Sequence, residues 1–279
     1  MDNRVDFQDP SDQLDFCATK YPVILVSGLG FQDQNNLINY WGKTPDFLKK
    51  YGCEVYTAYQ DAFNSHVDNA IKLKKRVNDI LEKSGHEKIN IIGHSKGGIE
   101  GRYMTSRLGM EDKVSSLTTL GSPHKGSGIA DMVVGRVPIS KIVLARLMNT
   151  YGRLMGDKRP DSLRAAVQLT SLAMERFNED VPDVSKVYYQ SFAGHVNKTY
   201  PSILWRSLAG ILYATDGKND GLVSIESAKW GDYRGLIQTE KAPSVSHADM
   251  IGMAQFSNAD FDAKWFFANI IHDLKEKGH

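Results

Sequence analysis

Long apolar runs, cysteines and an excess of either charge are all scarce in this sequence of 279 residues. No stretch approaches the roughly 18 uninterrupted apolar residues that a membrane-spanning helix needs. With 34 Lys and Arg against 33 Asp and Glu, the formal net charge is +1, and no basic run predicts a nucleic-acid partner. Two cysteines, Cys17 and Cys53, are too few to indicate a disulfide scaffold, so we expect two free thiols.

The first residues, MDNRVDFQDPSDQLDF, are acidic and polar. They lack the basic segment followed by an apolar segment that forms a secretory signal peptide. We therefore expect a cytoplasmic protein, or a secreted one if the sequence is that of the mature form. Apolar residues make up 41% and charged residues 24%, which is typical of a globular protein with a sizeable core. The length suits one large α/β domain, so we expect a single domain over residues 1–279.

Segments typical of strands and of helices alternate along the chain. Apolar segments predict strands at 21–28, 54–59, 88–93, 114–121, 187–194 and 234–240. Amphipathic patterns predict one helix at 66–83 and another at about 259–276. A third predicted helix begins directly after the third strand, with the residues GGIEGRYMTSRLG. This alternation predicts an α/β fold with a doubly wound, mainly parallel sheet.

The interval between the fourth and fifth strands is long, at about residues 124–186, and its pattern is helical throughout. Residues 137–156 and 161–178 each predict a helix. A helical insertion at this point covers the carboxyl ends of the strands, which is where parallel sheets bind ligands.

The stretch IIGHSKGG fits the pattern G-x-S-x-G with Gly93, Ser95 and Gly97. It lies between an apolar strand and a helix, where a strained turn exposes the serine and where side chains on the flanking residues would clash. The amide of Lys96 then points out of the helix N-terminus, where negative charge is favoured. This context predicts a serine nucleophile.

A serine nucleophile needs a base, and a histidine base needs a carboxylate to orient it. Of the eight histidines, His247 follows the last strand, where the chain order serine, acid, histidine places the base. His124, just past the fourth strand, is the alternative base. The acid must lie between serine and base on a loop, and Asp220 in NDGLV is favoured over Asp216.

The segments TKYPVILVSGLGF, GHSKGG, GSPHKGS, NDGLVS and SHAD occur in an order that resembles the bacterial triacylglycerol lipases of the α/β-hydrolase fold. The resemblance is to the pseudomonad and Proteus lipases and their clostridial relatives. It covers about residues 20–255 and is least specific in the helical insertion. It implies a cap or lid at about residues 127–183.

The same resemblance implies a role for each site residue. Ser95 is the expected nucleophile, Asp220 the acid and His247 the base, and the amides of Leu29 and Lys96 are the expected oxyanion donors. We expect a serine ester hydrolase that cleaves carboxylic esters of lipids. The alternatives are a short-chain carboxylesterase or acyltransferase with the same triad, and a catalytically silent lipid-binding protein. The expected partner is a small-molecule or lipid ester, and the resemblance leaves open a transient contact with a lipid interface.

Three departures from the family pattern stand out. Ser27 replaces the histidine that precedes the first glycine of the oxyanion turn; we expect this to change how the loop is braced but not the donor itself. The family's calcium site is matched only by Asp249, so we expect no metal or other cofactor, with calcium at Asp249 as the alternative. We expect Asp249 instead to cap the helix after His247. The family's disulfide is not matched, since no cysteine follows Cys53.

Aromatic residues after the oxyanion turn have two interpretations. Tyr40, Trp41 and Phe47 either line the acyl pocket or anchor a helix to the sheet, and we favour the second. The apolar residues of the insertion, together with Leu29 and Phe31, favour a lipid-like acyl chain; they also suit a cap that simply packs on the sheet.

Overall fold

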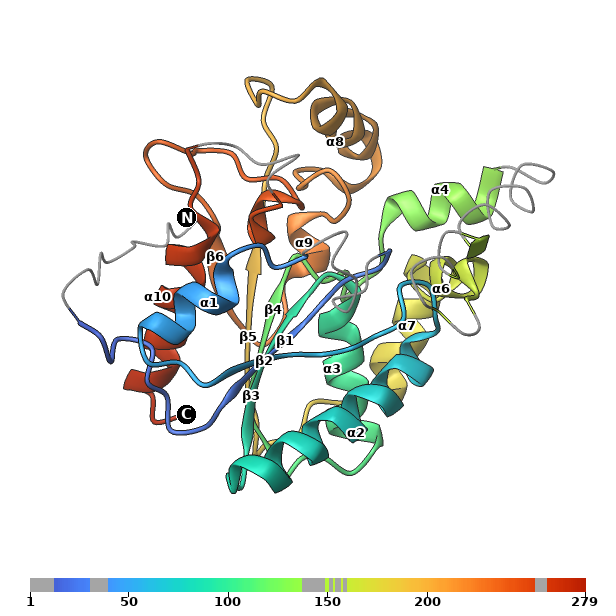
Figure 1. The fold of residues 1–279 in the computed structure, drawn as a ribbon. Helices are drawn as coiled ribbons and strands as arrows, with labels where there is room; N and C mark the ends of the chain where they lie inside the picture. The colour runs from blue at the N-terminus through green and yellow to red at the C-terminus, as the bar shows by residue number, and fades with distance from the viewer. Residues whose placement is uncertain are drawn as a thin grey trace.

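A six-stranded sheet forms the centre of the protein (Figure 1). The computed structural model describes residues 13–30, 40–136, 149–150, 153, 157, 160–253 and 260–279. The strands are β1 (Val23–Val26), β2 (Val55–Thr57), β3 (Ile89–His94), β4 (Val114–Leu120), β5 (Tyr188–Ala193) and β6 (Asp232–Leu236). Their order is β2-β1-β3-β4-β5-β6, and every neighbouring pair is parallel. The predicted fold class is therefore confirmed.

Helices cover both faces of this sheet. On one face lie α1 (Thr44–Lys50) and α10 (Ala263–Glu276), and on the other α2 (His66–Ser84) and α3 (Lys96–Arg107) (Figure 1). All four residues of β1 are buried, with Val23 and Leu25 facing the first pair of helices and Ile24 and Val26 the second. A strand covered on both faces needs a continuous apolar run, which is why its sequence does not alternate.

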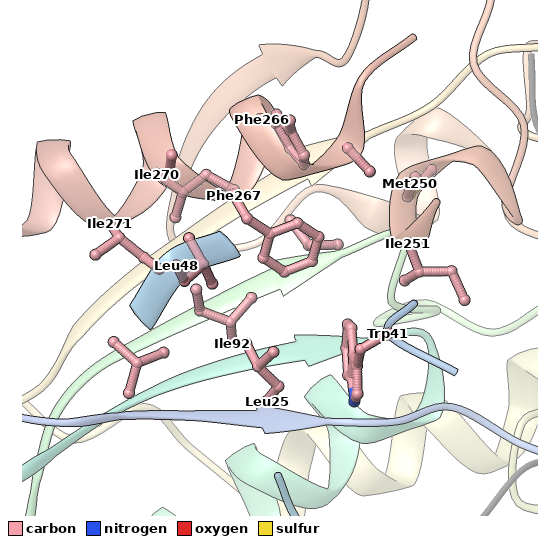
Figure 2. Close-up of a cluster of buried hydrophobic side chains, with 14 of the residues drawn as sticks. Leu25, Trp41, Leu48, Ile92, Met250, Ile251, Phe266, Phe267, Ile270 and Ile271 are labelled. Atoms are coloured by element: carbon pink, nitrogen blue, oxygen red, sulfur yellow. The ribbon is translucent and has the colours of Figure 1, made fainter. Parts of the chain in front are cut away.

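The larger apolar core lies under α10. Figure 2 shows Phe266, Phe267, Ile270 and Ile271 of this helix above Leu48 of α1 and the apolar side chains of the sheet. Trp41 and Ile251 belong to the same cluster, and the ring of Trp41 contacts Phe267 edge to face, at 5.7 Å between centroids. The segment after the oxyanion turn and the segment after His247 are therefore both anchored on α10.

Further helices lie outside these two layers. The insertion between β4 and β5 contains α4 (Gly128–Arg136), α6 (Ser162–Val167) and α7 (Ser171–Asp180). After β5 come α8 (Ile203–Asp216), α9 (Ile225–Ala228) and the 3-10 helix η1 (Asp249–Ile251). Helix α4 packs against both α6 and α8 (Figure 1). These three helices form a covering layer that comes from two separate stretches of chain. Among the described helices, none has the length and apolar character to cross a membrane.

Several predicted boundaries are wrong. Residues 161–178 contain two helices: α6 ends at Val167, and α7 begins after Thr170, whose side chain accepts a hydrogen bond from the amide of Ala173. The last strand is β6, which lies earlier than the predicted 234–240. The helix predicted at 137–156 lies largely outside the described residues. Helix α8 was not predicted at all.

Candidate active site

Ser95 lies in the sharp turn between β3 and α3. With φ 54° and ψ −127°, it is the one non-glycine residue with positive φ among the described residues. The flanking glycines are required by close packing: a Cβ on Gly93 would lie 2.6 Å from the Gly98 backbone, and one on Gly97 would lie 2.4 Å from the carbonyl oxygen of Val26. The turn thus has the strained geometry that raises a serine hydroxyl above the end of the sheet.

Asp220 and His247 form a buried pair. The Asp220 Oδ2 atom lies 2.8 Å from Nδ1 of His247. Its Oδ1 atom accepts the amides of Leu222 and Val223 at 2.9 and 2.8 Å, so the carboxylate is fixed by its own turn. Because an ionised carboxylate only accepts hydrogen bonds, Nδ1 carries the proton and Nε2 is left with a lone pair. That is the tautomer of a general base.

A cavity of about 500 Å³ opens onto Ser95 and His247. Ser95, His247, Gly28 and Leu29 contribute to its lining, so the predicted nucleophile, base and first oxyanion donor share one space. The rest of the wall is mostly apolar and comes largely from the covering helices: Ile129, Ala130 and Val133 of α4, Leu163 and Ala166 of α6, Leu204 and Trp205 of α8, and Ile251 of η1.

Helix α8 is the part of this wall that sequence reasoning missed. Trp205 packs on the turn that carries the acid: a Cβ on Gly221, where φ is +102°, would lie 2.5 Å from the indole ring. The signal was present in Ser202, whose hydroxyl caps the amide of Trp205. Ile203, Leu204, Ile211 and Tyr213 are exposed, so the helix is apolar on faces that do not pack on the sheet.

The alternative base, His124, lies in a different environment. It is fully buried, with Nδ1 3.3 Å from Nη1 of Arg102 and Nε2 3.0 Å from the hydroxyl of Thr119. Burial, and then the charge of Arg102, lower its pKa well below the usual value for histidine. Both ring nitrogens are engaged between β4 and α3, which favours His247 over His124 as the candidate base.

The carboxylate of the alternative acid, Asp216, contacts the start of α4. Its Oδ2 atom accepts the amide of Gly128 at 3.0 Å, at the beginning of α4. Since Asp216 is the last residue of α8, this bond joins the two stretches of the covering layer. The carboxylate also suits the positive end of the α4 dipole.

Asp249 does not cap a helix as predicted. The N-cap of η1 is Ala248, and Asp249 is the first residue inside it. Its Oδ2 atom accepts the hydroxyl of Tyr200 and the amide of Ser246, each at 2.7 Å. The carboxylate is therefore buried as a brace of the loop that carries His247. In the described part of the chain, no cluster of three or more His, Cys, Asp or Glu residues could hold a metal.

Lys96, the residue after Ser95, forms a buried ion pair. The ammonium group of Lys96 pairs with Glu100 one turn along α3, and both side chains are about 1% exposed. Asn69 donates a hydrogen bond of 2.9 Å to the same carboxylate, and Gln60 donates another. Burial raises the pKa of Glu100, and the charge of Lys96 opposes this shift. Because Lys96 begins α3, its backbone amide has no partner in a preceding helical turn.

The aromatic residues after the oxyanion turn divide between the two interpretations. Trp41 is in the core, and Phe47 packs against Trp265 of α10, as predicted. Tyr40 is also buried, but it lines the cavity. Cys17 and Cys53 are free and buried, as expected.

Comparison with known proteins gives a consistent family. The chain matches the alpha/beta hydrolase fold family over residues 12–200. It is 32% identical over 252 residues to a triacylglycerol lipase of Vibrio cholerae, covering 80% of each protein. It is 34% identical over 179 residues to a triacylglycerol lipase of Pseudarthrobacter phenanthrenivorans, covering 60% of this chain and 56% of that one. The mature lipase of Bacillus licheniformis superposes with a TM-score of 0.69 at 20% identity, over 98% of this chain and 96% of that one.

The chain belongs to the α/β-hydrolase fold family. The family match and the identity to the Vibrio protein confirm the resemblance that the motifs indicated, and the structural likeness to the Bacillus lipase confirms the fold. The relatives are named triacylglycerol lipases, which confirms the prediction of a carboxylic ester hydrolase.

Proposed function

We propose that the protein is a serine hydrolase for carboxylic esters of lipids, with Ser95 as nucleophile, His247 as base and Asp220 as acid. The observation that carries this proposal is the placing of Ser95 and His247 on one cavity, with Asp220 2.8 Å behind the imidazole. The hydroxyl of Ser95 attacks the ester carbonyl carbon while Nε2 of His247 takes its proton. Asp220 holds the ring and stabilises it while it is charged.

The second half of the reaction reuses the same groups. The imidazolium of His247 gives its proton to the leaving alkoxide, and an acyl-enzyme remains on Ser95. A water molecule then loses a proton to His247 and attacks the acyl carbon. Release of the carboxylic acid returns the proton to Ser95. The amides of Leu29 and Lys96 are the donors for the negative oxygen in both halves.

The apolar wall of the cavity supports a lipid-like acyl chain. Its volume of about 500 Å³ falls in the range of small-molecule sites, and apolar side chains of α4, α6 and α8 supply most of the surface away from Ser95. An alkyl chain buried there gains about 0.8 kcal/mol per methylene. We expect the gain in kcat/KM with chain length to continue until the cavity is filled.

Hydrolysis of p-nitrophenyl esters from acetate to palmitate tests the proposal, with the wild type and Ser95→Ala and with and without EDTA. We expect activity that rises with chain length, is lost in the variant and is indifferent to EDTA. Activity limited to short chains would favour a carboxylesterase. A folded wild type that neither cleaves any ester nor reacts with a fluorophosphonate at Ser95 would refute the proposal and favour a silent lipid-binding protein.

A further inference from the structure

Three loops meet at the proposed site, and two buried side chains connect them. The loops are the oxyanion turn after β1, the nucleophile turn after β3 and the loop of His247. Tyr40 and His94 lie between these loops, and each is 2% exposed. The amide of Gly28 lies 2.9 Å from the Tyr40 hydroxyl, which lies 2.5 Å from Nδ1 of His94. Nε2 of His94 lies 3.0 Å from the carbonyl oxygen of His247.

The direction of every hydrogen bond in this chain follows from its ends. A carbonyl oxygen only accepts, so Nε2 of His94 carries the proton and donates to His247. Nδ1 of a neutral imidazole then accepts, so the Tyr40 hydroxyl donates to it. The Tyr40 oxygen in turn accepts from Gly28. Burial, and then the neighbouring His247, lower the pKa of His94 well below its usual value, in agreement with a neutral ring.

We propose that Tyr40 and His94 are positioning residues, forming a hydrogen-bonded relay that holds the oxyanion turn at Gly28 in register with Ser95 and with the loop of His247. This inference rests on the proposed function, because it concerns the same site. Gly28 is packed closely against both Ser95 and Tyr40, so a shift of one would be felt by the others: a Cβ on Gly28 would lie 2.9 Å from the Cβ of Ser95 and 2.9 Å from the Tyr40 hydroxyl.

The relay also accounts for Ser27. The Ser27 hydroxyl is buried and has no hydrogen-bond partner within the described part of the structure, so it braces nothing. The support that the family pattern places at position 27 comes here from Tyr40, through the next residue's amide. A donor held this way needs no reorganisation when the oxyanion forms.

Tyr40→Phe tests the relay, since it removes one hydroxyl and keeps the ring. Losing an oxyanion donor costs about 10²–10³ in kcat, and losing its support should cost less, so we expect a fall of about tenfold in kcat with little change in KM. Tyr188→Phe is the matched control, because its hydroxyl contacts Asp232 at the far end of β5, away from the cavity. For His94, a Gln supplies one acceptor and one donor and should retain more activity than Leu.

A second readout separates positioning from folding. An alkyl boronic acid forms a tetrahedral anion on a catalytic serine and needs the oxyanion donors, whereas a long-chain alcohol only fills the apolar cavity. We expect Tyr40→Phe to weaken boronate inhibition by the same factor as kcat and to leave alcohol inhibition unchanged. Equal loss of both, or a variant that behaves like Tyr188→Phe, would overturn the relay.

A measurement on the wild type keeps the relay and the proposed function distinct. Nitrogen-15 spectra of the histidines report which ring nitrogen of His94 carries the proton, whether or not the protein is active. An Nε2–H tautomer whose Nδ1 signal shifts in Tyr40→Phe supports the relay even if no ester is cleaved. An active enzyme with the proton on Nδ1 of His94 would refute the relay alone.

Discussion

The backbone strain at Ser95 leads us to a prediction about the stability of two variants. Ser95 has φ 54° and ψ −127°, a region that L side chains rarely adopt. A non-glycine residue held in such a region costs about 1–3 kcal/mol, and glycine carries no such cost. Replacement by glycine also loosens the unfolded chain, at a cost of roughly 0.5–1 kcal/mol. We therefore expect Ser95→Gly to be more stable than Ser95→Ala, with a free energy of unfolding about 1 kcal/mol higher.

The comparison of two variants isolates the backbone. Both lack the hydroxyl and both should be inactive, so any difference in stability comes from the Cβ. For a chain of this size 1 kcal/mol corresponds to about 2–4 °C in the melting temperature. Calorimetry or urea unfolding at neutral pH measures it. Ser207, exposed in the interior of α8, is the matched control, because a glycine there should be less stable than an alanine.

Whether the turn is strained follows from which variant, Gly or Ala, is the more stable at Ser95 and at Ser207. If Ser95→Gly were no more stable than Ser95→Ala, while the Ser207 pair behaved normally, the turn would store no strain. The serine would then be raised above the sheet by packing alone, and the argument from positive φ would fail.

Three further predictions concern buried polar groups. Ser27→Ala should raise the free energy of unfolding by about 1 kcal/mol in urea, with unchanged kcat/KM, because the lost hydroxyl has no partner. Glu100→Leu should lower the free energy of unfolding by about 3–5 kcal/mol, because it leaves Lys96 buried and unpaired. Adding Lys96→Met should recover most of this loss, and a double variant no more stable than the single one would contradict the prediction. Burial lowers the pKa of His66 to about 4, so the unfolded chain binds a proton that the folded one does not between pH 6.5 and 4, and stability falls as pH falls. His66→Gln should reduce that slope by up to about 1.4 kcal/mol per pH unit, measured as unfolding free energy in urea across this pH range.

Much of the site could be predicted because strand ends carry it. Ser95 follows β3, and the turn of Asp220 and the loop of His247 follow β5 and β6 in the expected order. Apolar strands and glycine turns are local patterns, so chain order favoured His247 over His124, and the tight turn NDGLV favoured Asp220 over Asp216. The contacts of those two alternatives, with α4 and with Arg102, are consistent with that choice.

The covering layer was harder to predict, and the physical reason lies in α8. Helix prediction relies on apolar residues that share one buried face, but Ile203, Ile211 and Tyr213 are exposed. Only Trp205 and its neighbours pack on the acid turn. Residues at a cavity rim lack the simple inside–outside pattern, so the sequence predicts no helix in this segment.

Supporting residues are the other part that local patterns do not show. The sequence predicts Asp249 as a helix cap because a polar residue precedes a helix, but its carboxylate contacts Tyr200, 49 positions away. Tyr40 belongs to the apolar core, as predicted, and its hydroxyl also contacts Gly28 and His94. In both cases one partner lies on a distant segment of the chain, and the contact exists only once the sheet has brought the segments together. We therefore expect the oxyanion turn, which has Ser27 where the resembled lipases have a histidine, to depend for its support on Tyr40 and its contacts with Gly28 and His94.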